Sequence, residues 1–174
     1  MAKYVAFLRG INLGGRTVKM EPLRKAFEEW GYEDVTTILA SGNLVFETAK
    51  KDLKGLRAEI EAGLKRVFGF DVRVILRSEK QIKDLIKENP FKGVKLTPKT
   101  RLFITFLTEP PKAKTAFGSA GKNGIYAVAK DHVVSVLGAK DATPDHMTLL
   151  KKEFGTNITT RNWNTILKVA RALE

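Results

Sequence analysis

The stretch FLRGINLGGR, residues 7–16, holds the side chains and backbone groups best suited to binding chemistry. Glycine allows positive φ angles and lets backbone N–H groups approach a ligand closely. Arginine adds charge-assisted hydrogen bonds, so the combination is typical of a phosphate or carboxylate site. The stretch also precedes a predicted helix, whose N-terminus favours an anion. The residues that we assign to this candidate site are Arg9, Asn12, Gly14 and Gly15.

The spacing of these glycines excludes two familiar phosphate-binding loops. The letters GINLGG lack the G-x-G-x-x-G spacing of dinucleotide-binding proteins, and no Walker A pattern is present. A second interpretation stays open, in which the loop is a tight connection that needs glycine and Asn12 hydrogen-bonds to its own backbone. The residue types fit a ligand site and a structural turn equally well.

A second polar cluster, Ser41 to Asn43, separates two β-rich runs at residues 34–40 and 44–48. Such a cluster is typical of a hairpin turn, which explains it without a ligand. Ser41 is not expected to be a nucleophile, because the G-x-S-x-G pattern is absent and no histidine lies near it in the sequence.

A third polar cluster, Arg161 and Asn162, lies at the start of the last predicted helix, residues 160–173. Thr159 or Thr160 is the expected N-cap of this helix. A cation in the first turn opposes the helix dipole, and a functional contact would explain its presence. An arginine that is simply exposed to solvent is the alternative.

Hydrophobic periodicity predicts the order β-α-β-β-α-β in the first half of the chain. The expected elements are a strand at 3–9, a helix at 20–30, strands at 34–40 and 44–48, a helix at 51–68 and a strand at 71–77. This order indicates a ferredoxin-like antiparallel sheet with both helices on one face. The first and third strands are then central neighbours, which brings Arg9 beside Asn43. The third strand lacks the aromatic pattern of an RNA-recognition motif, which argues against that class.

The chain is expected to be α+β throughout and to form two halves. Residues 1–90 form the ferredoxin-like half, and residues 91–174 form a smaller α+β half with a mainly antiparallel sheet and two final helices. The first strand is apolar on both faces, unlike a strand with one face in water, so we expect the halves to pack over a shared core. No clear sequence repeat is visible, although the second half is compatible with a degraded version of the first.

Composition limits the partners and the chemistry. Lys and Arg number 31 against 19 Asp and Glu, a net charge of +12, which favours a phosphorylated small molecule or nucleic acid. Lysines that only keep the surface soluble are the alternative. Without cysteine, and with no recognisable partner for His132 or His146, we expect no metal site, no cofactor and no histidine base. No apolar run approaches a membrane span and no signal-peptide cleavage site is visible, so we expect a cytoplasmic protein without a membrane partner.

Three motifs together resemble a known family. RGINLGG, then MEPLRKAFEEWGYEDVTTILASGNLVFE, then TTRNWNTILKVA are similar to the bacterial family of domain of unknown function 1697. The resemblance runs from the first strand to the last helix and is loose between residues 80 and 140. It implies an α+β fold related to ferredoxin-like units. It implies no activity and no catalytic residue, because the name of the family states that its function is unknown.

The leading hypothesis is therefore a binding protein for an anionic ligand, with the three polar clusters around one site. An enzyme that acts on a phosphorylated or nucleotide-like substrate in the same pocket is the first alternative, and the sequence nominates no general base for it. A purely structural role for the motifs is the second. The proposed ligand-binding residues are Arg9, Asn12, Gly14, Gly15, Ser41, Asn43, Arg161 and Asn162.

Overall fold

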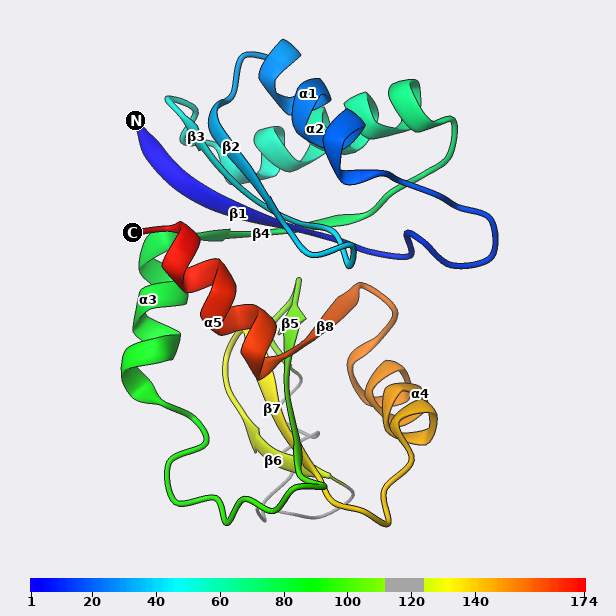
Figure 1. Ribbon diagram of the computed structural model, residues 1–174, viewed down its shortest axis with the longest axis vertical. Helices are drawn as coiled ribbons and strands as arrows, with labels where there is room; N and C mark the ends of the chain where they lie inside the picture. Colours follow the sequence, from blue (N-terminus) through cyan, green and yellow to red (C-terminus); the bar gives the residue numbers. More distant parts are fainter. Residues whose placement is uncertain (112–123) are drawn as a thin grey trace. The chain divides into compact units, whose positions relative to one another are not determined.

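The computed structural model describes residues 1–111 and 124–174 of the chain. These residues form two compact units (Figure 1): Met1–Lys87 together with Leu167–Glu174, and Glu88–Ile166. None of the helices in the described part of the chain combines the length and apolar composition that crossing a membrane requires.

The first unit has the predicted ferredoxin-like topology. Its strands lie in the order β2-β3-β1-β4 and every neighbouring pair is antiparallel. Phe7 in β1 pairs with Asn43 in β3 on one side and with Ile75 in β4 on the other. The elements are β1 (Ala2–Leu8), α1 (Met20–Glu29), β2 (Glu33–Ile38), β3 (Asn43–Thr48), α2 (Leu53–Phe68), β4 (Val74–Ser78) and α3 (Glu79–Glu88).

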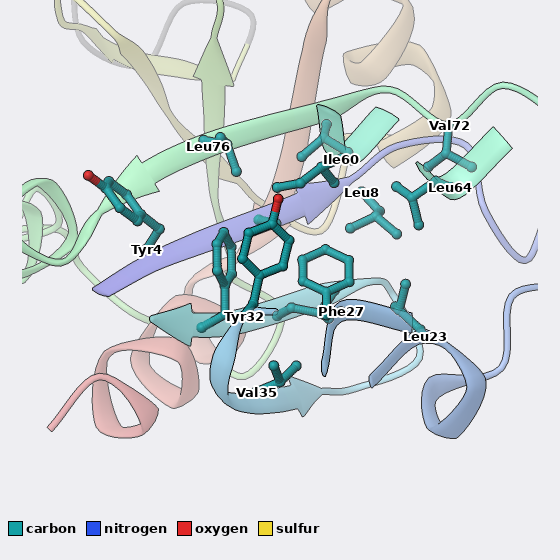
Figure 2. Packing of buried hydrophobic residues seen from close by; sticks show 14 of the residues in the cluster. Tyr4, Leu8, Leu23, Phe27, Tyr32, Val35, Ile60, Leu64, Val72 and Leu76 are labelled. Carbon is teal, nitrogen blue, oxygen red and sulfur yellow. The ribbon is translucent and has the colours of Figure 1, made fainter. Parts of the chain in front are cut away.

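Helices α1 and α2 both cover the same face of this sheet, as expected (Figure 1). Alternate residues of the strands, such as Tyr4 and Leu8, form one buried cluster with Phe27 of α1 and Ile60 of α2 (Figure 2). The Phe27 ring lies edge-on to Phe46, with 5.4 Å between the ring centroids. Aromatic packing of this kind adds to the free energy gained from apolar burial.

The opposite face of the first sheet is buried as well. Val5 and Phe7 are 0% exposed, and Val45 and Ile75 on neighbouring strands are almost as deep. This pattern confirms that neither face of β1 lies in water, which the alternation of apolar residues predicts.

The second unit is also an antiparallel α+β structure, with its strands in the order β6-β7-β5-β8. Residues 158–162 form its last strand, so our prediction that the final helix begins at residue 160 is wrong. The pairing of Thr159 and Arg161 with β5 holds this segment extended. The elements are β5 (Arg101–Leu107), β6 (Ile125–Val128), β7 (His132–Leu137), α4 (Thr143–Phe154) and β8 (Ile158–Asn162). Helix α5 (Trp163–Ala172) begins in this unit, and its residues from Leu167 belong to the first unit.

The two sheets are structural repeats whose three central and last strands pair in the same register. In the first, Val5 pairs with Val45 and with Arg77; in the second, Ile104 takes the place of Val5 and pairs with Val134 and Arg161. The hydrogen bond that ends the pairing of the two central strands is also present in both sheets. Leu8 N donates to the Gly42 carbonyl in the first, and Leu107 N donates to the Asp131 carbonyl in the second. The second sheet thus has the strand order of the first and the same register around its central strand.

The repeat extends into the helix that follows each last strand. Ser78 ends β4, and its Oγ accepts a hydrogen bond from Gln81 N at 3.2 Å. Asn162 ends β8, and its Oδ1 accepts from Thr165 N at 2.8 Å. Each side chain therefore caps its helix from the residue directly after a buried arginine, Arg77 or Arg161.

We expect Gly63→Ala to destabilise the first unit, although alanine is ordinarily favoured over glycine inside a helix by about 1 kcal/mol. A Cβ at residue 63 would lie 2.6 Å from the Trp30 ring, so overpacking should cost about 1–3 kcal/mol. Urea unfolding of the variant measures the change. The control is the same substitution in a Trp30→Leu background, where it should stabilise; a loss of stability in both backgrounds would contradict the packing argument.

Candidate functional site

The glycine-rich loop leaves the end of β1 between two other segments of the first unit. Leu8 N donates to the Gly42 carbonyl at 2.8 Å, and Arg9 N donates to the Arg73 carbonyl at 2.9 Å. The loop therefore starts between the turn that joins β2 to β3 and the residues that lead into β4. The predicted juxtaposition of Arg9 with the start of β3 is confirmed.

Asn12 fastens the loop to the turn. Its Nδ2 donates to the Ala40 carbonyl at 2.7 Å, and its Oδ1 accepts from Val18 N at 2.9 Å. Asn12 adopts φ 57°, in the left-handed region that asparagine tolerates better than most residues. These contacts give Asn12 the local role of the second interpretation, and its part in ligand binding stays a prediction.

Residues 14 and 15 are glycine because their backbone has positive φ angles, and not because a side chain would clash there. Their φ angles are 56° and 82°, and no atom lies within 4 Å of where a Cβ would be. Helix α1 begins only at Met20, so these glycines do not form its first turn as a phosphate-binding loop would. The loop instead offers its own amides at an exposed surface.

Arg9 is the charged group that this arrangement leaves without compensation. Its side chain is half-buried, and burial followed by the nearby charge of Arg73 holds the pKa of its guanidinium below the ordinary value. Within residues 1–111 and 124–174 the guanidinium makes neither a hydrogen bond nor an ion pair. A cation in this position has lost hydration and gained a like-charged neighbour.

The other two arginines at this edge have partners. Arg73 forms a 3.5 Å ion pair with Glu61 and is 68% exposed at its side chain. Arg16 donates to the Asp71 carbonyl and lies over the Phe70 ring, 4.9 Å from its centroid. Arg16 therefore ties the far end of the loop to the segment before β4.

Ser41 and Asn43 shape the turn. Asn43 is fully buried, and its Nδ2 donates to the Ile38 carbonyl at 2.7 Å and to Ser41 Oγ at 2.9 Å. At Gly42, with φ 84°, a Cβ would lie 2.6 Å from Ile11 Cδ1, so the turn packs tightly on the glycine-rich loop. These contacts agree with the turn interpretation, and direct contact with a ligand stays a prediction.

Arg161 and Asn162 belong to the second unit, and their surroundings differ from those we expected. Arg161 is a buried strand residue whose Nη1 donates to Thr159 Oγ1 at 2.7 Å and to the Thr160 carbonyl at 3.0 Å. Burial lowers its pKa to about 10, which leaves it charged at neutral pH. It is not in the first turn of a helix, so the argument from the helix dipole does not apply.

Asn162, and not Thr159 or Thr160, caps the last helix. Its Oδ1 accepts from both the backbone N and the Oγ1 of Thr165, at 2.8 and 2.9 Å. The prediction of an N-cap at Thr159 or Thr160 is therefore wrong, because both residues lie in β8. That Arg161 and Asn162 share one ligand with the glycine-rich loop stays a prediction.

The structure contains partners for both histidines that the sequence analysis did not find. His146 Nε2 lies 2.7 Å from Ser135 Oγ, and His132 Nδ1 lies 2.8 Å from Asp131 Oδ1. Ser135 is 0% exposed, so the first pair is a core contact and not an accessible nucleophile and base. The pair forms because α4 packs against β7 in the fold, and no spacing in the sequence predicts it.

Two hollows in the described structure lie away from the predicted residues. One, of about 480 Å³, is lined by residues of the first unit that include Lys3 and Glu47. The other, of about 400 Å³, is lined by residues around the start of α4 that include Lys140 and His146. Neither involves the glycine-rich loop, and the described residues contain no cluster of three or more metal-binding side chains.

Asn12→Gly should lower the free energy of unfolding by about 1 kcal/mol. Glycine keeps the positive φ but loses the hydrogen bonds to Ala40 and Val18, which are worth about that much at a partly exposed site. Asn12→Ala should cost more, because alanine adds backbone strain. Urea unfolding measures both variants; a glycine variant as stable as the wild type would show that these bonds contribute nothing.

Asn162→Ala should cost about 1 kcal/mol, as loss of an N-cap does, whereas Asn162→Asp should stay within about 0.5 kcal/mol of the wild type. Aspartate keeps the acceptor that Thr165 uses and removes the amide donors. Thermal or urea unfolding of both variants tests this. Equal losses would mean that the amide donors matter and that capping is not the main role of the residue.

Comparison with known proteins supports the fold and shows the family. The model of a family described as "Protein of unknown function (DUF1697)" matches residues 1–133, which include the glycine-rich loop and the turn before Asn43. The solved structure of a conserved bacterial protein from Streptococcus pneumoniae is similar over 99% of both chains, with 24% identity and a TM-score of 0.75. No curated protein matches the chain. Since the family match covers well over half of the residues, the chain belongs to the DUF1697 family of proteins of unknown function.

Proposed function

We propose that this protein binds an anionic ligand through its glycine-rich loop, with the Arg9 guanidinium as the main cation. The observation that carries the proposal is the state of Arg9: half-buried, close to Arg73, and without a hydrogen bond or ion pair among the described residues. A phosphate or carboxylate between the two arginines would replace their repulsion with attraction to a shared anion.

Backbone donors in the loop that follows Arg9 support the proposal. Within the described part of the chain, the amide N–H groups of Gly14 and Gly15 donate to no other residue. The positive φ angles at these glycines orient successive amides in the manner of an anion-binding concavity. The loop is also held at both ends, by Asn12 and by Arg16, so less conformational entropy is lost when a ligand orders it.

The polar side chains around the loop then have a supporting role. Asn12, Ser41 and Asn43 hold the loop and the turn in place through the local bonds described above. Arg9 and the glycine amides are the groups that would touch the anion. The ligand class is a phosphorylated small molecule or nucleic acid, as the net charge of +12 favours.

Arg9→Gln should reduce the affinity for the anion by roughly 10- to 100-fold, the loss expected for a hydrogen bond to a charged group. The measurement is a thermal-shift screen of inorganic phosphate, sugar phosphates, nucleotides and short oligonucleotides. A bound compound raises the Tm of the wild type by mass action and should fail to do so for the variant. Without ligand, the variant should be at least as stable as the wild type, because it loses the repulsion from Arg73.

Arg57→Gln is the matched control, because it makes the same change at a half-buried arginine near the start of α2. Its ligand-induced shift should equal that of the wild type. A steep loss of affinity with rising salt would identify nucleic acid, whereas a shallow dependence would identify a small anion. No shift for any compound, or equal shifts in the wild type and Arg9→Gln, would refute the proposal.

A further inference from the structure

We infer that the anionic ligand carries an apolar group, aromatic or aliphatic, which lies against Leu13 and Leu39. This inference rests on the proposed function and names the ligand more closely, as an organic phosphate or carboxylate with an apolar substituent next to its charge. It starts from two leucines whose positions the fold itself does not explain.

Both leucines lie beside the hydrogen bond that joins the two loops. Leu13 follows Asn12 and Leu39 precedes Ala40, and the 2.7 Å bond runs from Asn12 Nδ2 to the Ala40 carbonyl. Leu13 is 70% exposed and Leu39 is 45% exposed. Two large apolar side chains are thus left in water on adjoining loops, at the edge of the sheet that also carries Arg9.

Leu39 is also in a backbone conformation that leucine rarely adopts. Its φ is 59°, in the left-handed region where glycine and asparagine are the usual residues. Strain of this kind persists where the surroundings or the function require the side chain. Folding alone would favour asparagine or glycine at residue 39, since a leucine there is only partly buried and has a strained backbone.

An apolar group on the ligand accounts for both observations. Charge on the ligand would engage Arg9 and the glycine amides, while its apolar part would remove the leucine side chains from water. Covering roughly 55 Å² of apolar surface would raise the affinity about tenfold over that of the bare anion. The ligand would therefore be recognised by the pairing of a charge with a neighbouring apolar group.

The test compares phenyl phosphate with inorganic phosphate, by titration calorimetry and by the amide NMR shifts of Gly10, Gly14 and Gly15. The wild type should bind phenyl phosphate about tenfold more tightly than inorganic phosphate. Leu39→Asn should lose this preference while its affinity for inorganic phosphate stays unchanged. The same variant should melt about 3 °C higher without ligand, because asparagine relieves the strain, so lost binding would not reflect misfolding.

Leu53→Asn is the control, since Leu53 is 38% exposed and begins α2, far along the chain from both loops. It should keep the preference for phenyl phosphate. Equal affinity for the two compounds in the wild type, or a preference that survives Leu39→Asn, would overturn this inference and leave the proposed function standing. Failure of the wild type to bind any compound of the wider anion screen would overturn both.

Discussion

The antiparallel pairing of β1 with β3 is the constraint on which the first unit depends. It places Phe7 opposite Asn43 and ends with the hydrogen bond from Leu8 N to the Gly42 carbonyl. Because the two chain segments separate at this point, the glycine-rich loop and the β2–β3 turn must emerge side by side. The Asn12 bridge, the close packing of Gly42 on Ile11 and the exposed pair of leucines all follow from that geometry.

The same pairing is present in the second unit, where the chemistry is different. Leu107 N donates to the Asp131 carbonyl, but Thr108 stands where the first unit has Arg9, and its Oγ1 donates to the Asn157 carbonyl. The position of Asn43 is taken by His132. One scaffold thus carries an uncompensated arginine in one copy, and a threonine and a histidine with local partners in the other. Loops placed on a common fold can differ in this way.

Within the first unit the polar residues divide into two groups by their contacts. One group forms hydrogen bonds to the backbone or within the group, and these bonds hold the edge of the sheet in place; it consists of Asn12, Ser41 and Asn43. Arg9 and the amides of Gly14 and Gly15 have no such partners among the described residues. The anion-binding site that we propose needs both a fixed frame and free donors.

The sequence by itself determined the order of elements in the first half, its ferredoxin-like topology and the edge that Arg9 shares with Asn43. These features follow from hydrophobic period and strand alternation, which are local properties. Only the tertiary structure decided that residues 158–162 are a strand, since it is the pairing with β5 that holds them extended. It alone placed Ser135 against His146 and made Arg161 a buried residue. Such contacts depend on strand register between segments far apart in the chain, and a pattern within one segment carries no information about that register.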